Sequence, residues 1–352
     1  MIIILFIFVI MEIRVNKLSE TPLYRQIIEF VLAQVKSGAS PEGDMLPSMN
    51  ELAARLDISK ETVKKAYGIL TERGLVEPRQ GKGFYVSGRS KGGPQTILVL
   101  LDKLSEYKQI FLNTLSDKLG DGYQVTIRLF NQSVDLLKYY LDEELDLYDY
   151  YLVSPHFPLD ARSQKSGLKQ MMRIPNRKLI MIDNWMKEFQ GHYGAVYQDF
   201  DNDIYDGLSQ GLEDLKKRGR LNVISLPSSL YHDRICVAIR RFCADNDLDV
   251  KFFNGVTPGC IRKGDTYLLL NSQLDSGLLD LVRTAEKKGL EATKDISIIS
   301  YNDSPMNQLV LGGLTTTSAD FSQMGELAAK MILNRNMEKV RCNFTLTRRN
   351  TF

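Results

Sequence analysis

From residue 96 onward, apolar runs typical of buried strands alternate with segments that carry the apolar spacing of helices. The first such runs are TILVLL, YQVTIRLF, DYYLVS and KLIMID, and the pattern resumes after a crossover near AVYQD with LNVISL, VKFF, DTYLLLN and DISIIS. Strands and helices that alternate in this way form parallel βαβ units with buried sheets. We therefore predict an α/β fold over residues 96–352, and the crossover predicts two lobes.

Residues 11–87 carry a different pattern, which predicts an α+β winged helix-turn-helix domain. Thr21 followed by proline predicts a helix start with Thr21 as its cap. Ser48-x-x-Glu51 is a capping box, and Ser59 is placed to cap a third, basic helix. The strand-like runs LVEPR and FYV flank QGKG and predict a hairpin, or wing. In such a fold the third helix enters the major groove of DNA.

Positive charge is concentrated in the same part of the chain. The whole chain has a formal net charge of +2, but residues 58–91 carry eight lysines and arginines against three glutamates, a net charge of +5. An anionic partner is therefore expected there. Each feature also has a structural alternative, because exposed lysines are commonly a solvated face, Ser48 is a helix cap in any case, and Gly81 and Gly83 suit a turn. The combination favours DNA binding.

The first domain resembles the DNA-binding domain of GntR-type transcription regulators, nearly end to end, in the run PLYRQIIEFV…GDMLPSMNELAARLDISKETVKKAYGILTERGLVEPRQGKGFYV. One departure is Asn50, which stands where that family often has arginine. The resemblance implies a double-stranded DNA operator as partner, with phosphate contacts from Ser48 and Thr62 and a minor-groove contact from Gly81. The expected DNA-binding residues are Ser48, Asn50, Ser59, Lys60, Thr62, Lys64, Lys65, Arg79, Gly81 and Lys82.

Polar side chains follow the strands of the second domain. Ligands of open parallel sheets bind beyond the carboxyl ends of the strands. Carboxylates, amides, one arginine and the only tryptophan gather at these ends and favour a small polyhydroxylated ligand. We assign Tyr197 to the later of the two lobes. The candidate ligand-binding residues are Asp102, Lys103, Tyr107, His156, Asp183, Trp185, Tyr197, Arg234, Asn271, Gln273 and Asn302.

The second domain resembles the effector domain of LacI/GalR-type repressors, itself similar to periplasmic sugar-binding proteins. The resemblance lies in VISLPSSLYHDRICVAIRRF, YLLLNSQLDSG, EATKDISIISYNDSP and GGLTTTSADFSQMGELAAKMIL. It implies a periplasmic-binding-protein-like fold and ligand contacts from Asp183, Arg234, Asn271 and Asn302. Two positions depart from the pattern, because that family usually has aspartate where Asn302 and Ser272 stand. The two domains together are similar to arabinose-responsive hybrid regulators, so analogy points to arabinose or fucose.

Three of these candidates have a competing structural interpretation. Trp185 can fill an interface between the lobes without touching a ligand. Arg234 can serve only as an ion-pair partner of Asp233 or Asp199. His156 can be a hinge or core residue.

The sequence contains none of the motifs that would indicate an enzyme. P-loop, GxGxxG, GxSxG and HExxH patterns are all missing, and the three histidines lack ligand spacing. Cys236 and Cys243 lie seven residues apart on one predicted helix, which indicates a shared core-facing stripe. We therefore predict no catalytic residue, no metal and no cofactor. Four cysteines without a disulfide pattern favour a reducing, cytoplasmic location.

The chain opens with MIIILFIFVI, an apolar run of ten residues. At about 1.5 Å per residue it cannot span a hydrocarbon core of about 30 Å. It also lacks the charge order and cleavage site of a signal peptide. We expect residues 1–10 either to result from a start codon assigned too early, with Met11 as the true initiator, or to be a disordered extension. We expect residues 88–95 to be a linker.

The hypothesis from the sequence is a homodimeric transcription regulator whose operator binding is controlled by a small sugar, with no membrane partner. One alternative is a sugar-binding receptor module that does not bind DNA. Another is a regulator that responds to a ligand other than a sugar.

Overall fold

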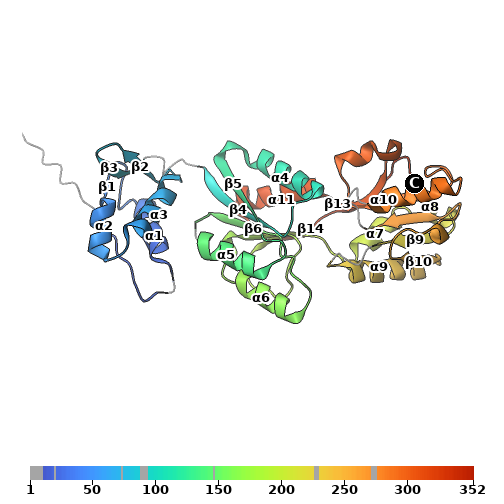
Figure 1. Ribbon diagram of the computed structural model, residues 1–352, viewed down its shortest axis with the longest axis horizontal. Coiled ribbons are helices and arrows are strands. Elements are labelled where there is room, and N and C mark those ends of the chain that lie inside the picture. The colour runs from blue at the N-terminus through green and yellow to red at the C-terminus, as the bar shows by residue number, and fades with distance from the viewer. Residues whose placement is uncertain are drawn as a thin grey trace, which may run out of the picture. The chain divides into compact units, whose positions relative to one another are not determined.

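The computed structural model describes residues 11–352 except 20, 73, 88–93, 146, 226–229 and 271–275. It divides into two compact units, Met1–Gln95 and Thr96–Phe352 (Figure 1). The expected N-terminal extension and most of the expected linker lie outside the described residues. Within the described residues, no helix is both long enough and apolar enough to cross a membrane.

The first unit combines helices with a small antiparallel sheet in the order β1-β3-β2. Its elements are α1 (Leu23–Ser37), β1 (Met45–Leu46), α2 (Met49–Leu56), α3 (Lys60–Glu72), β2 (Val76–Arg79) and β3 (Gly83–Val86). The predicted hairpin is confirmed as β2 and β3, and β1 adds a third strand that the sequence did not indicate. The buried faces of the helices close over this sheet, with Tyr67 donating a 2.8 Å hydrogen bond to the carbonyl of Pro47.

The helix caps of the first unit agree with the sequence at two of three places. Ser48 Oγ accepts a 3.2 Å hydrogen bond from the Glu51 amide, and Ser59 Oγ accepts a 3.1 Å bond from the Thr62 amide. The predicted cap at Thr21 is wrong. Pro22 is the N-cap residue of α1 and makes no side-chain cap. Its carbonyl accepts the first amides of the helix, so the chain can start the turn without a capping side chain.

The second unit contains two six-stranded sheets, one in each lobe. The first lobe has the strand order β14-β8-β7-β6-β4-β5, and the second has the order β10-β9-β11-β12-β13-β15. The described pairings are parallel except for β13 with β15. This confirms the predicted α/β class.

The strands of the first lobe are β4 (Gln95–Leu101), β5 (Tyr123–Leu129), β6 (Tyr150–Val153), β7 (Leu179–Asp183), β8 (Gly194–Tyr197) and β14 (Lys339–Arg341). Those of the second lobe are β9 (Leu221–Ile224), β10 (Val250–Phe253), β11 (Thr266–Leu269), β12 (Ser297–Tyr301), β13 (Thr315–Ala319) and β15 (Phe344–Thr347).

The helices of this unit are α4 (Glu106–Leu119), α5 (Val134–Glu144), α6 (Ala161–Met171), α7 (Asp203–Ser209), α8 (Leu212–Lys217), α9 (His232–Asp245), α10 (Ser276–Lys287) and α11 (Phe321–Asn334). Short 3-10 turns are η2 (Gly120–Gly122), η3 (Asn176–Lys178), η4 (Pro258–Cys260), η5 (Pro305–Gln308) and η6 (Val310–Gly312). Gly211 lies between α7 and α8, and its backbone passes so close to Leu346 that a Cβ there would lie 2.8 Å from the Leu346 side chain.

The chain crosses between the lobes three times: between β8 and α7, between β13 and α11, and between β14 and β15. Helix α11 follows a strand of the second lobe but packs on α4, β7 and β8 of the first lobe (Figure 1). Tyr197 ends β8, so its predicted place in the later lobe is wrong. Tyr197 belongs to the first lobe because β8 pairs with β7, and the chain crosses to the second lobe only after β8.

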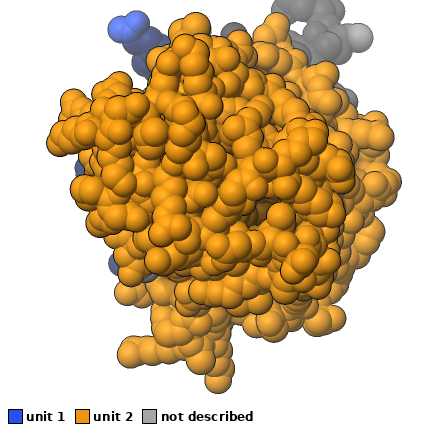
Figure 2. Space-filling model, turned by 90° about the vertical axis from the view of Figure 1, so that its right-hand side faces the viewer, with its two compact units in different colours: residues 1–95 blue, residues 96–352 orange. Residues whose placement is uncertain are grey.

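The core of the second unit lies on both sides of the sheets. All described residues of β6, β7, β9, β11 and β12 are buried, as expected for parallel strands covered by helices. Figure 2 shows one face of this unit as a closely packed body that is hollowed near its middle.

Candidate DNA-binding surface and ligand site

The basic face of α3 is exposed. Lys60, Lys64 and Lys65 all face solvent, whereas Val63 and Tyr67 on the opposite face are buried. Lys64 Nζ lies 3.6 Å from a carboxylate oxygen of Glu61, with both side chains more than 60% exposed. Surface pairs of this kind stabilise a fold little, so the lysine stays available to a stronger anion.

The first turns of α2 and α3 carry further candidates, and each of these turns is held by a side-chain cap, Ser48 for α2 and Ser59 for α3. Ser59 Oγ and Thr62 Oγ1 are 2.7 Å apart. Ser48 and Asn50 are exposed at the start of α2. Backbone amides at a helix start carry partial positive charge and suit phosphate.

The hairpin holds three further candidates, Gly81 and Lys82 in its turn and Arg79 at the end of β2. Gly81 has a left-handed φ of 70°, which its turn requires, and Lys82 is exposed next to it. Arg79 is held within the hairpin: Nε donates a 2.8 Å bond to Glu77, and the guanidinium lies 4.4 Å from the centre of the Tyr85 ring. Lys82 is therefore the less constrained cation of the wing.

In the second unit, a buried ionic cluster lies at the strand ends of the first lobe. Lys108, from the first turns of α4, forms ion pairs with Asp102 after β4 and with Asp183 at the end of β7, the second at 3.0 Å. Its Nζ also donates a 3.1 Å bond to Ser154 after β6. All four side chains are buried. Asp102 and Asp183 were candidates from the sequence, and the cation between them was not.

Lys108 could have been found from helical spacing. Phe111, Leu112 and Leu115 are buried core residues of α4, and Lys108 stands three, four and seven positions before them. That spacing places it on the same helix face. A lysine on a core-facing stripe requires buried carboxylates, and the structure supplies two.

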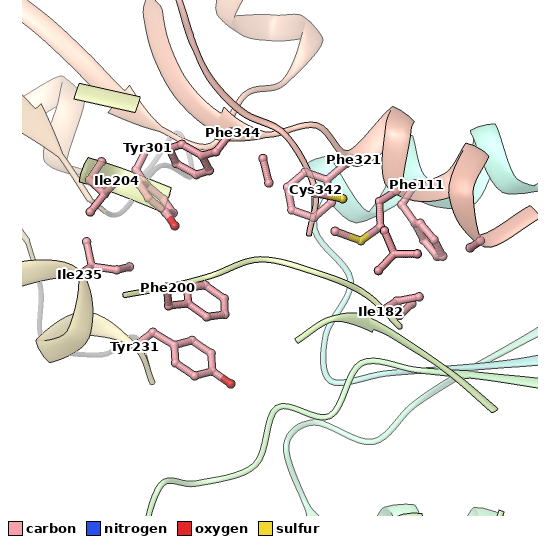
Figure 3. Close-up of a cluster of buried hydrophobic side chains, with 14 of the residues drawn as sticks. Phe111, Ile182, Phe200, Ile204, Tyr231, Ile235, Tyr301, Phe321, Cys342 and Phe344 are labelled. Atoms are coloured by element: carbon pink, nitrogen blue, oxygen red, sulfur yellow. The ribbon is translucent and has the colours of Figure 1, made fainter. Parts of the chain in front are cut away.

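His156 links the cluster to the second lobe. Its Nε2 lies 2.8 Å from Asp183 Oδ2, and its Nδ1 lies 2.8 Å from the hydroxyl of Tyr231. Asn184 also donates a 3.0 Å bond to that hydroxyl. The Tyr231 ring stacks on Phe200 with centroids 3.9 Å apart (Figure 3). Tyr231 therefore reaches from the second lobe into the strand ends of the first.

The charges of the cluster stabilise one another. Burial alone would raise the pKa of the Asp183 carboxyl, but Lys108 and His156 hold it well below its ordinary value. Burial alone would likewise lower the pKa of Lys108, but Asp183 and Asp102 raise it above its usual value. Lys108 is thus a fixed cation and Asp183 a fixed anion near neutral pH.

Ligand atoms of Asp102, His156 and Asp183 lie within 4.8 Å of one another, a spacing that a metal ion could bridge. The ammonium group of Lys108 is already paired with both carboxylates. Its positive charge opposes a second cation at this position, so the residues do not fit a metal.

Two strand ends have a left-handed backbone. Asp183 at the end of β7 and Asn302 after β12 both have φ of 68°, an uncommon conformation that often marks a functional site. Asn302 Oδ1 and Gln198 Oε1 are buried without a hydrogen-bond partner in the described part of the chain. Buried oxygens of this kind ordinarily have a partner, so a donor such as a ligand hydroxyl would satisfy them.

A cavity of about 900 Å³ opens beside Asn302. It lies between the start of α4 in the first lobe and η5 in the second, and Tyr107, Gln109, Asn302 and Asn307 line it among others. Tyr107 packs against Phe321 with ring centroids 4.7 Å apart. Tyr107 and Asn302 are thus brought together.

The remaining candidates lie elsewhere or have other partners. Trp185 stacks on Tyr197 at 4.9 Å, and both pack against a hydrophobic cluster that does not include Phe200 or Tyr231. Lys103 is exposed. Asn271 and Gln273 lie outside the described residues.

Arg234 has an ion-pair partner that the sequence did not indicate. The expected structural alternatives were Asp233 and Asp199, but its Nε and Nη2 donate to the two carboxylate oxygens of Asp201 at 2.6 and 2.7 Å. Asp201 lies in the crossover between β8 and α7, and only the folded crossover brings it to Arg234 on α9.

Two family models match the chain. Residues 23–86 match the model described as bacterial regulatory proteins, gntR family, and residues 271–346 match the periplasmic binding protein-like domain. Both resemblances inferred from the sequence are thereby confirmed.

Curated relatives match about a fifth of this chain. The HTH-type transcriptional repressor YtrA of Bacillus subtilis is 38% identical over 79 residues, which are 22% of this chain and 61% of the relative. The HTH-type transcriptional repressor STM4068 of Salmonella typhimurium is 33% identical over 79 residues, which are 22% of this chain and 33% of the relative. The match thus spans less than two thirds of these relatives. Both are named as repressors, a non-enzymatic function, in agreement with the prediction.

Solved structures match the second unit's fold. The trehalose repressor of Escherichia coli has a TM-score of 0.58 at 14% identity, covering 72% of this chain and 100% of that one. A dimeric Lac repressor has a TM-score of 0.56 at 16% identity, covering 73% and 98%. A regulator from Alkaliphilus metalliredigens, complexed with D-xylulofuranose, has a TM-score of 0.55 at 15% identity, covering 73% and 98%. At these identities the likeness shows the fold alone.

Proposed function

Because this chain joins a GntR-type winged helix-turn-helix domain to a periplasmic-binding-protein-like domain, we propose that it is a transcriptional repressor controlled by a small ligand. One observation carries the proposal. The same chain contains a winged helix-turn-helix unit with an exposed basic helix and a two-lobed unit with polar side chains at its strand ends. Its DNA partner is a double-stranded operator, and its site of action is the cytoplasm.

The ligand of this proposal is a small sugar held between the lobes. Buried oxygens of Gln198 and Asn302 that lack partners in the described chain support a ligand rich in hydroxyl donors. The D-xylulofuranose complex of one structural neighbour adds support by analogy. Arabinose and fucose are the first sugars to test, on the analogy drawn from the sequence.

The regulator acts as a homodimer. A single recognition helix reads a short half-site, and two-fold symmetric pairs of such helices read near-palindromic operators. The second unit supplies the pairing surface and the switch. Its three crossovers allow the lobes to change their angle when a ligand binds between them. Such coupling is typically about 1–3 kcal/mol.

The recognition role of α3 is tested by Lys64→Ala. Removing one phosphate-facing cation should weaken operator binding and reduce the slope of log K against log salt by about one. Fluorescence anisotropy with operator DNA at several salt concentrations measures both. Lys138→Ala, which removes an exposed lysine from α5 in the second unit, is the matched control. Unchanged DNA affinity in Lys64→Ala would remove α3 from the interface.

Effector control is tested by a thermal-shift screen with neutral pentoses and hexoses. A sugar that binds the native state should raise the unfolding temperature of the second unit, by mass action. The same sugar should change operator affinity about 5- to 150-fold. If no sugar does either, while DNA binding is intact, the sugar effector is wrong and the DNA-binding function stands.

A further inference from the structure

Lys108 and Arg234 lie beside the contact between His156 of the first lobe and Tyr231 of the second, and both are paired with carboxylates. Lys108 is paired with Asp102 and Asp183, and Arg234 is paired with Asp201. Lys103 and Lys187 are exposed nearby, where water screens their charge.

The Arg234–Asp201 pair is bidentate and open to solvent. Its two hydrogen bonds are 2.6 and 2.7 Å long, and the side chains are 36% and 44% exposed. The guanidinium carbon lies 5.7 Å from the centre of the Tyr231 ring, whose hydroxyl reaches His156 in the first lobe. The pair therefore lies beside the contact between the lobes, where a bound ligand can reach it.

We propose that Asp201 makes this ligand site select uncharged polyhydroxylated molecules and reject phosphorylated or carboxylated ones, by neutralising Arg234. This inference rests on the proposed effector function. It assigns to Asp201 a specificity role that the sequence candidates did not include.

The physical reason is the fork geometry of the pair. A guanidinium has five N–H donors, and the carboxylate occupies two of them. A sugar hydroxyl can accept from a remaining donor without breaking the pair. A phosphate or carboxylate competes for the same fork and faces the Asp201 charge at short range, and the described part of this region offers it no unpaired buried cation in compensation.

The test uses titration calorimetry to measure how tightly the full chain binds inorganic phosphate, neutral sugars and the monophosphates of those sugars. Wild type should bind a neutral sugar and show no phosphate binding. Asp201→Asn should gain at least about tenfold in affinity for phosphate, because it releases an arginine fork. Asp233→Asn removes the same charge from the neighbouring residue of Arg234 and leaves the pair intact. It should behave like wild type, and Asp201→Asn/Arg234→Gln should lose the gain.

Two results would overturn the inference. One is a wild-type protein that binds a sugar monophosphate more tightly than the neutral sugar. The other is an Asp201→Asn protein, folded by circular dichroism, whose phosphate affinity equals that of Asp233→Asn. Failure of the effector function is distinguishable, because it would abolish the response to every sugar while the phosphate measurement on Asp201→Asn still decides the role of Asp201.

Discussion

Among single residues, Lys108 is a buried cation inside the otherwise largely apolar core of the second unit. Lys108 lies on the buried face of α4, where the other buried residues are apolar. Asp102, Asp183 and Ser154 come from three neighbouring strand ends and satisfy it. One charged side chain thus ties β4, β6 and β7 together on the face from which Tyr231 approaches.

Lys108→Met is expected to destabilise the second unit by about 3–5 kcal/mol, because it leaves two buried carboxylates without a cation. Urea unfolding followed by circular dichroism measures this change. Lys103→Met provides the matched control, since that lysine is exposed in the loop just before α4 and should shift stability by less than about 0.5 kcal/mol. Equal stability of the two variants would show that the cluster does not depend on Lys108.

Among the helices, the contact between α4 and α11 depends on one glycine. A Cβ at Gly325 of α11 would lie 2.7 Å from the carbonyl oxygen of Phe111 and 3.0 Å from the amide nitrogen of Leu115. Both are backbone atoms of α4, which cannot rotate away. The absence of a side chain therefore allows α11, which arrives from the second lobe, to pack closely on the first.

Gly325→Ala is expected to lower the stability of the second unit by about 1–3 kcal/mol, because the helices must move apart. Gly68→Ala is the opposite case. Gly68 is exposed in the interior of α3, and beyond its chain neighbours and the backbone of its own helix an alanine methyl there would meet no described heavy atom within 4 Å, so this change should stabilise the first unit by about 0.5–1 kcal/mol. Scanning calorimetry of the full chain checks both, and a stabilising Gly325→Ala would contradict the packing argument.

Across the second unit as a whole, an ion pair joins the lobes next to the crossovers. Arg341 of β14 donates to Asp203 at 2.6 and 2.8 Å and to Asp206 at 2.6 Å, both on α7 of the second lobe. Asp203 is buried, and burial raises its pKa to about 6 despite Arg341. The pair therefore balances a buried carboxylate with a cation from the other lobe.

Arg341→Gln should destabilise the second unit by about 1–3 kcal/mol at pH 7, because it leaves Asp203 without its cation. With its pKa raised, the native carboxyl takes up a proton at a pH where the unfolded one has released it. Stability is therefore regained as the pH falls from about 7 to about 4. Urea unfolding across that range measures the effect. Arg348→Gln, which breaks the exposed pair with Asp214, is the control and should change stability little at any pH in this range. A pH-independent deficit in Arg341→Gln would be inconsistent with an ionised Asp203.

Local patterns in the sequence were sufficient to define the two domain types and most of their elements. Caps at Ser48 and Ser59, the hairpin around Gly81 and the alternation after residue 96 depend on neighbouring residues alone, and local backbone chemistry fixes them. Asp183 and Asn302 were found for a similar reason, because a polar residue directly after an apolar strand marks the strand's end.

Which side chains meet was settled by the folded arrangement of the elements. Lys108 with Asp183, Arg234 with Asp201, and His156 with Tyr231 are pairs between residues 75, 33 and 75 positions apart in the sequence. Such contacts depend on the strand order and on three crossovers between the lobes. Periodicity places a residue on a face of its own element, but it carries no information about which element lies opposite. That choice follows from burying both sheets and both sets of helices at once.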